Sequence, residues 1–198
     1  RRSWRGFCSM LANKTFSRVV VPEFRLAPAH AFPLAIEDIQ NTFRALFTEE
    51  QIARSLDSGS VNDLPEIIIA ADSSGASIAM ALLLNLRERF RKSISKVILF
   101  SPWLNLSESS YLKSGKKLSD EVMTSDCLKT SGDVYTYSSN LSNYLVSPIN
   151  SSKELLSGLP PFFIKMEEKE IIPGFTPDTE VPVANEETTH YNGELEEI

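Results

Sequence analysis

Short apolar runs and apolar residues at helical spacing alternate along most of the chain. Buried strands are predicted where β-branched or aromatic residues cluster, at residues 18–24, 67–71, 96–101 and 162–166. Helical spacing predicts helices over residues 33–47 and 74–91, with a short helix and a loop within 48–64. Strands that are separated by helices imply a parallel sheet with right-handed crossovers. The pattern therefore predicts an α/β fold.

The second of these strands ends abruptly at a serine, and a helix of small residues follows at once. Residues 67–77 read Ile-Ile-Ile-Ala-Ala-Asp-Ser-Ser-Gly-Ala-Ser. This layout is typical of a nucleophile elbow, which lifts a serine hydroxyl above the sheet and needs small residues such as Ala71 and Gly75 on either side. Ser73 would be the nucleophile, and the amide of Ser74 would donate to an oxyanion at the helix N-terminus. The other interpretation is that Ser73 is an N-cap residue.

Further segments resemble the hormone-sensitive-lipase-like α/β hydrolases. Residues 24–38 read Phe-Arg-Leu-Ala-Pro-Ala-His-Ala-Phe-Pro-Leu-Ala-Ile-Glu-Asp, and that family has Tyr-Arg-Leu-Ala-Pro-Glu-His-Pro-Phe-Pro-Ala-Ala-x-Glu-Asp. Residues 71–76, Ala-Asp-Ser-Ser-Gly-Ala, match its Gly-Asp-Ser-Ala-Gly-Gly elbow with two glycines replaced. Ser-Pro-Trp-Leu-Asn-Leu at 101–106 and Tyr-Leu-Val-Ser-Pro at 144–148 resemble two more of its motifs. These segments occur in the family's order.

The resemblance implies an α/β-hydrolase fold of mostly parallel strands with flanking helices. We expect a partial hydrolase domain over residues 1–172, without the first strands and the final strand–helix unit of the fold. Residues 106–145 are expected to form a cap or insert, or a loose loop. Residues 173–198 carry seven acidic side chains and no Lys or Arg, and are expected to form a disordered tail. The family's His-Gly-Gly-Gly oxyanion loop would precede residue 1.

The resemblance also implies a catalytic triad. Ser73 would be the nucleophile, Glu170 the acid and His190 the base, in the chain order that this fold requires. Glu170 lies in Glu-Lys-Glu-Ile-Ile, the context of the family's acid, although a solvated acidic turn is the other interpretation. His190 comes sooner after Glu170 than the family's base histidine comes after its acid, and it lies in the acidic tail. It is therefore either the base or an uninvolved tail residue. His30 matches a structural histidine, which we expect to be hydrogen-bonded.

The activity implied is that of a serine carboxylic-ester hydrolase. Its substrates would be small-molecule or lipid-like esters with short acyl chains, steryl acetates among them. The alternative is a non-catalytic ligand-binding protein, like the gibberellin receptors that share the Asp-Ser-Ser-Gly sequence, or an inactive fragment. The aromatic residues Trp103, Tyr111, Tyr135, Tyr137 and Tyr144 would line an acyl pocket or simply pack.

Charge and composition limit the kinds of binding partner and the cellular compartments that we expect. A net charge of −6 gives no reason to expect nucleic acid. Neither a metal site nor a cofactor is expected, and no apolar run reaches the roughly 18 residues of a membrane span. Two cysteines, and Asn-x-Ser/Thr sequons at Asn13, Asn105, Asn140 and Asn150, are compatible with the secretory pathway or with the cytoplasm. The sequence does not determine the oligomeric state.

Overall fold

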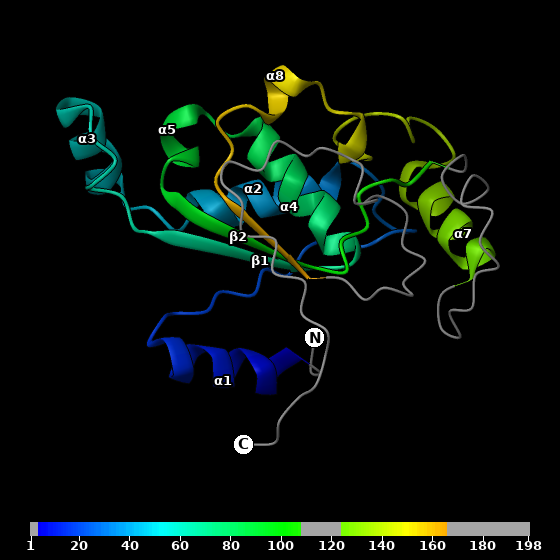
Figure 1. The fold of residues 1–198 in the computed structure, drawn as a ribbon, viewed down its shortest axis with the longest axis horizontal. Helices are drawn as coiled ribbons and strands as arrows, with labels where there is room; N and C mark the ends of the chain where they lie inside the picture. The colour runs from blue at the N-terminus through cyan, green and yellow to red at the C-terminus, as the bar shows by residue number, and fades with distance from the viewer. Residues whose placement is uncertain (1–3, 108–123, 166–198) are drawn as a thin grey trace.

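The central element is a three-stranded sheet, seen in a computed structural model that describes residues 4–107 and 124–165 (Figure 1). Its strands are β1 (Ile67–Asp72), β2 (Ile94–Phe100) and β3 (Phe162–Lys165), in the order β1-β2-β3. Both pairs are parallel, and Ile98 lies opposite Ala70 on one side and Phe163 on the other. The predicted parallel sheet is confirmed, and its carboxyl ends meet at one edge.

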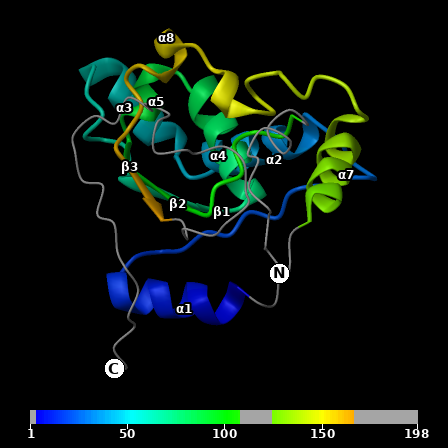
Figure 2. The ribbon, with the colours of Figure 1, turned by 45° about the vertical axis from the view of Figure 1, so that its right-hand side comes forward.

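Helices are distributed unevenly around this sheet. They are α1 (Trp4–Thr15), α2 (Leu34–Arg44), α3 (Glu49–Ser58), α4 (Ser74–Asn85), α5 (Glu88–Arg91), α7 (Ser125–Thr136) and α8 (Lys153–Leu156), with a 3-10 turn, η1, at Pro148–Asn150. Helices α2 and α4 cover one face, and α4 contacts both α2 and β1. Helix α1 lies on the opposite side of the sheet in both views and has no buried residue (Figure 2).

The core forms between α4 and the covered face of the sheet. In β2, Val97 and Leu99 are fully or almost fully buried, whereas Ile68 of β1 is 57% exposed and Phe163 of β3 is 41% exposed. This contrast follows from strand geometry, which sends successive side chains to opposite faces. Helix α4 buries Ala76, Ala81 and Leu83 completely, because small residues let it pack closely on the strands.

Residues 18–24 do not form the predicted strand. They have no helical or strand assignment, and Val20 and Val21 are about half exposed, at 46% and 58%. A β-strand needs a hydrogen-bonded neighbour. The sheet found in the described residues consists of β1, β2 and β3 and gives this segment none. The apolar run alone was therefore not a sufficient signal.

The single helix predicted over 74–91 is two helices. Helix α4 ends at Asn85, and Leu86 is extended, with φ −74° and ψ 139°. The chain then turns into α5, so that Leu86 and Phe90 both pack against the core. The two apolar side chains therefore reach the core from either side of the break.

The region predicted to be an insert or loose loop contains a regular helix, α7. Its N-cap is Thr124, whose hydroxyl accepts from the Cys127 amide at 3.2 Å. Polar composition hid this helix, although a capping threonine is a recognised start signal. Whether residues 106–145 act as a cap stays a prediction. The tail 173–198 lies outside the described residues.

Candidate active site

Ser73 lies in a sharp turn at the carboxyl end of β1, between Asp72 of the strand and Ser74 of α4. Its backbone has φ 51° and ψ −122°, a conformation that L-residues rarely adopt and that costs about 1–3 kcal/mol. Ser73 takes the N-cap position of α4, but its side chain makes no capping hydrogen bond. The capping role that the alternative interpretation gave this hydroxyl is therefore not observed.

Backbone hydrogen bonds hold this turn against the end of β2. The Ser73 amide donates to the Phe100 carbonyl at 3.0 Å, and the Ser73 carbonyl accepts from the Trp103 amide at 3.0 Å. The same carbonyl accepts from the Ala76 amide at 3.1 Å. Ser101, between the two partners on the β2 side, also has a positive φ of 42°. Two tight turns therefore lie side by side and bond to each other.

The first turn of α4 offers backbone donors beside Ser73. Ser74 is its first residue and is exposed. The first amides of a helix have no acceptor within the helix, and they carry partial positive charge. The Ser74 amide is thus suited to bind an oxyanion next to Ser73. A Cβ added at Gly75 would meet nothing within 4 Å, so within the described part of the chain the expected need for a small residue there is not seen.

Asp72 precedes Ser73 at the same end of the sheet. Its side chain is exposed, yet the surrounding protein partly desolvates the carboxylate and raises its pKa above the ordinary value. A carboxylate here adds negative potential beside the hydroxyl.

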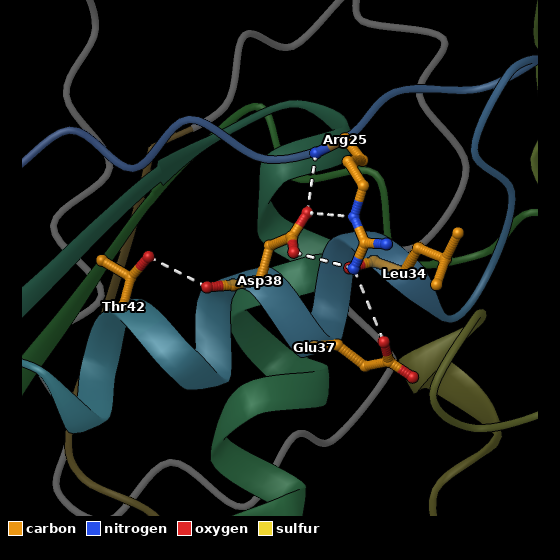
Figure 3. A network of polar contacts seen from close by, with 5 residues as sticks. All are labelled: Arg25, Leu34, Glu37, Asp38 and Thr42. Atoms are coloured by element: carbon orange, nitrogen blue, oxygen red, sulfur yellow. Dashed lines mark hydrogen bonds and ion pairs between the residues drawn. The ribbon is translucent and has the colours of Figure 1, made fainter.

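The segment between residues 25 and 38 is anchored by a charged clamp (Figure 3). Arg25 donates to the Asp38 carboxylate from its backbone amide at 2.9 Å, from Nε at 2.9 Å and from Nη2 at 2.8 Å. Glu37 lies 3.5 Å from the same guanidinium. The hydrogen bonds from Arg25 lower the pKa of Asp38 and, in return, raise the pKa of Arg25. The clamp fixes the loop 26–33 to the start of α2.

Helix α7 docks on that loop. The Phe32 amide donates to the Tyr135 carbonyl at 2.8 Å, and the two rings meet edge to face at 6.1 Å. The Tyr137 hydroxyl donates to the Pro28 carbonyl at 3.2 Å. Burial raises the pKa of Tyr135 to about 12. Segments a hundred residues apart in sequence therefore meet beside the sheet.

Of the aromatic residues considered for an acyl pocket, Trp103 and Tyr135 pack. Trp103 is 5% exposed and forms a small core with Leu106, Leu128 and Val146, against which Tyr135 packs. Tyr137 is 70% exposed. Tyr111 lies outside the described residues.

Two predicted triad members cannot be located, because Glu170 and His190 lie outside the described residues. The structure thus brings Ser73 and Ser74 together but does not test the triad. His30 is exposed and borders an open hollow of about 410 Å³. Its backbone amide donates to the Leu26 carbonyl at 3.0 Å, and among the described residues the expected hydrogen bond of the imidazole is not found.

Sequence reasoning missed one polar residue of the elbow, Ser77. It is 5% exposed, and its hydroxyl donates to the carbonyl of Trp103. The available signal was its position, four residues after Ser73 and hence one helical turn along α4. A serine within an otherwise apolar helix face is uncommon unless its hydroxyl has a partner.

The described ranges hold neither a candidate metal site nor a candidate membrane-spanning helix. Residues 4–107 and 124–165 contain no group of three or more His, Cys, Asp or Glu side chains that could hold a metal ion. In the same ranges no helix is both long and apolar enough to cross a bilayer.

Known proteins resemble this chain over most of its length. Residues 2–173 match a family model described as alpha/beta hydrolase fold. An esterase of Acinetobacter venetianus is 30% identical over 169 residues, which cover 85% of this chain and 51% of the relative. An acetyl-hydrolase of Streptomyces hygroscopicus is 25% identical over 86% of this chain and 52% of the relative.

A solved structure agrees with these relatives. A hormone-sensitive lipase from a metagenome library superposes with a TM-score of 0.52 at 27% identity, over 76% of this chain and 46% of that one. The chain spans about half the length of the two curated relatives above.

Proposed function

Since the chain belongs to the α/β-hydrolase fold family, in its hormone-sensitive-lipase-like group of esterases, we propose that Ser73 is the nucleophile of a serine carboxylic-ester hydrolase. The observation that carries the proposal is the backbone of Ser73, strained to φ 51° between β1 and α4. Strain at a non-glycine residue persists where the surrounding structure enforces it, and such residues gather at functional sites.

In the proposed reaction, Ser73 Oγ attacks the ester carbonyl carbon while its proton passes to a base. The carbonyl oxygen becomes an oxyanion, and the Ser74 amide donates to it. Collapse of this intermediate breaks the ester bond, and the alcohol leaves with the proton from the base. Water then attacks the acyl-enzyme by the same route, releasing the carboxylic acid and restoring the Ser73 hydroxyl.

His190 is the proposed base, and Glu170 the carboxylate that would orient it. Both are assigned by chain order and by resemblance, since both lie outside the described residues. A carboxylate in this role holds the imidazole in the productive tautomer and stabilises the imidazolium. Replacing either residue should slow acylation far more than it weakens substrate binding.

The proposed substrates are esters with short acyl groups, including lipid-like alcohols. The acetyl-hydrolase among the relatives supports the short acyl chain. The packing of Trp103 in a small core also favours a short acyl group, because a ring held in that core does not line a long channel.

A fluorophosphonate probe tests the nucleophile directly. It phosphonylates only activated serine hydroxyls, so the native chain should be labelled and Ser73→Ala should not be. Peptide mass spectrometry should place the label on Ser73. Ser131→Ala, which removes an exposed hydroxyl on α7, serves as the matched control and should label like the native chain.

Absence of labelling in the folded native chain would overturn the enzyme proposal for these 198 residues. The non-catalytic alternative would then be tested by adding a short-chain ester to the same preparation. A rise in melting temperature without hydrolysis would favour a ligand-binding protein.

A further inference from the structure

The strained turn at Ser73 depends on the neighbouring turn after β2. The Ser73 carbonyl accepts from the Trp103 amide, and the Ser73 amide donates to Phe100, so both backbone groups of Ser73 bond to residues 100–103. Any shift of that turn would move at least one of these partners. The conformation of Ser73 is therefore set by where residues 100–103 lie, as well as by β1 and α4.

That neighbouring turn is anchored in part to β3, because the Ser101 amide donates to the Lys165 carbonyl at 2.8 Å. Ser101 has a φ of 42°, which disfavours an L-residue. Pro102 is fully buried, and Trp103 is 5% exposed. A buried carbonyl such as that of Trp103 carries a desolvation cost unless a donor reaches it.

Ser77 supplies that donor from the helix that begins at the elbow. Its hydroxyl donates to the Trp103 carbonyl, and its side chain is almost wholly buried. Ser77 lies one turn along α4 from Ser73, so the helix fixes the distance between them. The bonds form a closed loop: Ser73 to Trp103 through the backbone, Trp103 to Ser77 through the hydroxyl, and Ser77 back to Ser73 through α4.

We infer that Ser77 is a positioning residue, whose hydroxyl holds the 100–103 turn so that Ser73 keeps its strained, reactive conformation. This inference rests on the proposed function only in its second half, the reactivity of Ser73. Its first half, that the Ser77 hydroxyl holds the 100–103 turn in place, concerns structure alone and can be tested without any activity.

Hydrogen exchange tests whether the bond from Ser77 to Trp103 holds the turn. In Ser77→Ala the Trp103 amide should exchange about tenfold faster, because losing a hydrogen bond of ordinary strength makes local opening easier. Ser77→Thr keeps a hydroxyl at the same position and should restore slow exchange. Unchanged exchange at Trp103 in Ser77→Ala would overturn the inference.

Ser93 offers a matched control at the far end of β2. It is also 5% exposed, and its hydroxyl donates to a backbone carbonyl, that of Phe90, at 2.7 Å. Ser93→Ala therefore removes a comparable bond without touching the elbow. It should leave exchange at Trp103 unchanged, and an equal acceleration in both variants would mean a general loss of stability and would overturn the inference.

Labelling kinetics test the link to reactivity. With the fluorophosphonate probe, Ser77→Ala should lower the first-order inactivation rate about tenfold and leave probe binding nearly unchanged, since the site is misaligned but not removed. Ser77→Thr should recover the rate, and Ser93→Ala should match the native chain. A Ser77→Ala rate equal to that of Ser93→Ala would overturn the positioning role. If the native chain does not label, the proposed function fails, and hydrogen exchange at the Trp103 amide alone then tests whether Ser77 holds the turn.

Discussion

Serine is an unusual occupant of a backbone with φ 51° and ψ −122°. Glycine adopts such a conformation without a Cβ penalty, whereas serine depends on the surrounding hydrogen bonds to stay in it. Those bonds come from Phe100, the last residue of β2, and from Trp103 in the turn that follows it, and helices α4 and α5 separate both from Ser73 in sequence. The chemistry proposed for one residue thus depends on two distant parts of the chain.

Glycine at position 73 should stabilise the fold while abolishing labelling. Ser73→Gly and Ser73→Ala both lack the hydroxyl, so their comparison isolates the backbone strain. We expect Ser73→Gly to have the higher free energy of unfolding, by about 1 kcal/mol, the relieved strain less the added chain entropy. Urea unfolding at pH 7 measures this. Equal stability of the two variants would show that the turn is unstrained.

At the scale of elements, α7 docks on the loop 26–33, about a hundred residues earlier in the sequence. One tyrosine in this contact also makes it sensitive to pH. Tyr135 is partly buried, and desolvation raises its pKa to about 12 from an ordinary value of 10.0. The folded state therefore holds the phenolic proton more tightly than the unfolded chain does.

This difference predicts alkaline destabilisation. Below pH 10 the contribution of Tyr135 is fully present. Between pH 10 and 12 the Tyr135 phenol is ionised in the unfolded chain but still protonated in the folded state. The free energy of unfolding should therefore fall, by about 2–3 kcal/mol in total. Tyr135→Phe cannot ionise and should lack this part of the decline. Urea unfolding from pH 9 to 12 measures both curves, and parallel curves would contradict the prediction.

The same scale shows what the sequence could and could not predict. Period and composition identified β1, β2, β3 and α2, because each buries an apolar face whose spacing is visible in the sequence. Residues 18–24 had a strand's composition, but pairing depends on a neighbour that composition does not reveal. Helix α7 was missed because its buried contact rests on few apolar side chains. Ser77 was missed because its partner, Trp103, is 26 residues away.

At the scale of the molecule, the sheet is covered unequally. Helices α2 and α4 lie on one face, while Ile68 and Phe163 on the other remain substantially exposed. Helix α1 lies on that second side without a buried residue. In residues 4–107 and 124–165, then, stability comes mainly from the face that carries α4, and the site at the strand ends depends on that face.

Charged substitutions at neighbouring residues of β1 should show how much each face of the sheet contributes to the free energy of unfolding. Ile68→Lys places a charge on the exposed side and should change the free energy of unfolding by no more than about 0.5 kcal/mol. Ile69→Lys puts the same charge against the core that α4 covers and should cost about 3 kcal/mol or more. Urea unfolding of both variants measures this, and similar losses would mean that both faces are packed.

The strain at Ser73 also has an evolutionary consequence. Most proteins drift toward the least stability that selection allows, and changes that raise stability are readily available to them. At position 73 a single substitution, Ser73→Gly, would be such a change, since glycine would relax the turn. A lineage released from the need for the hydroxyl would gain by taking it. A serine kept in a conformation that favours glycine is therefore the trace that selection for a reactive hydroxyl would leave.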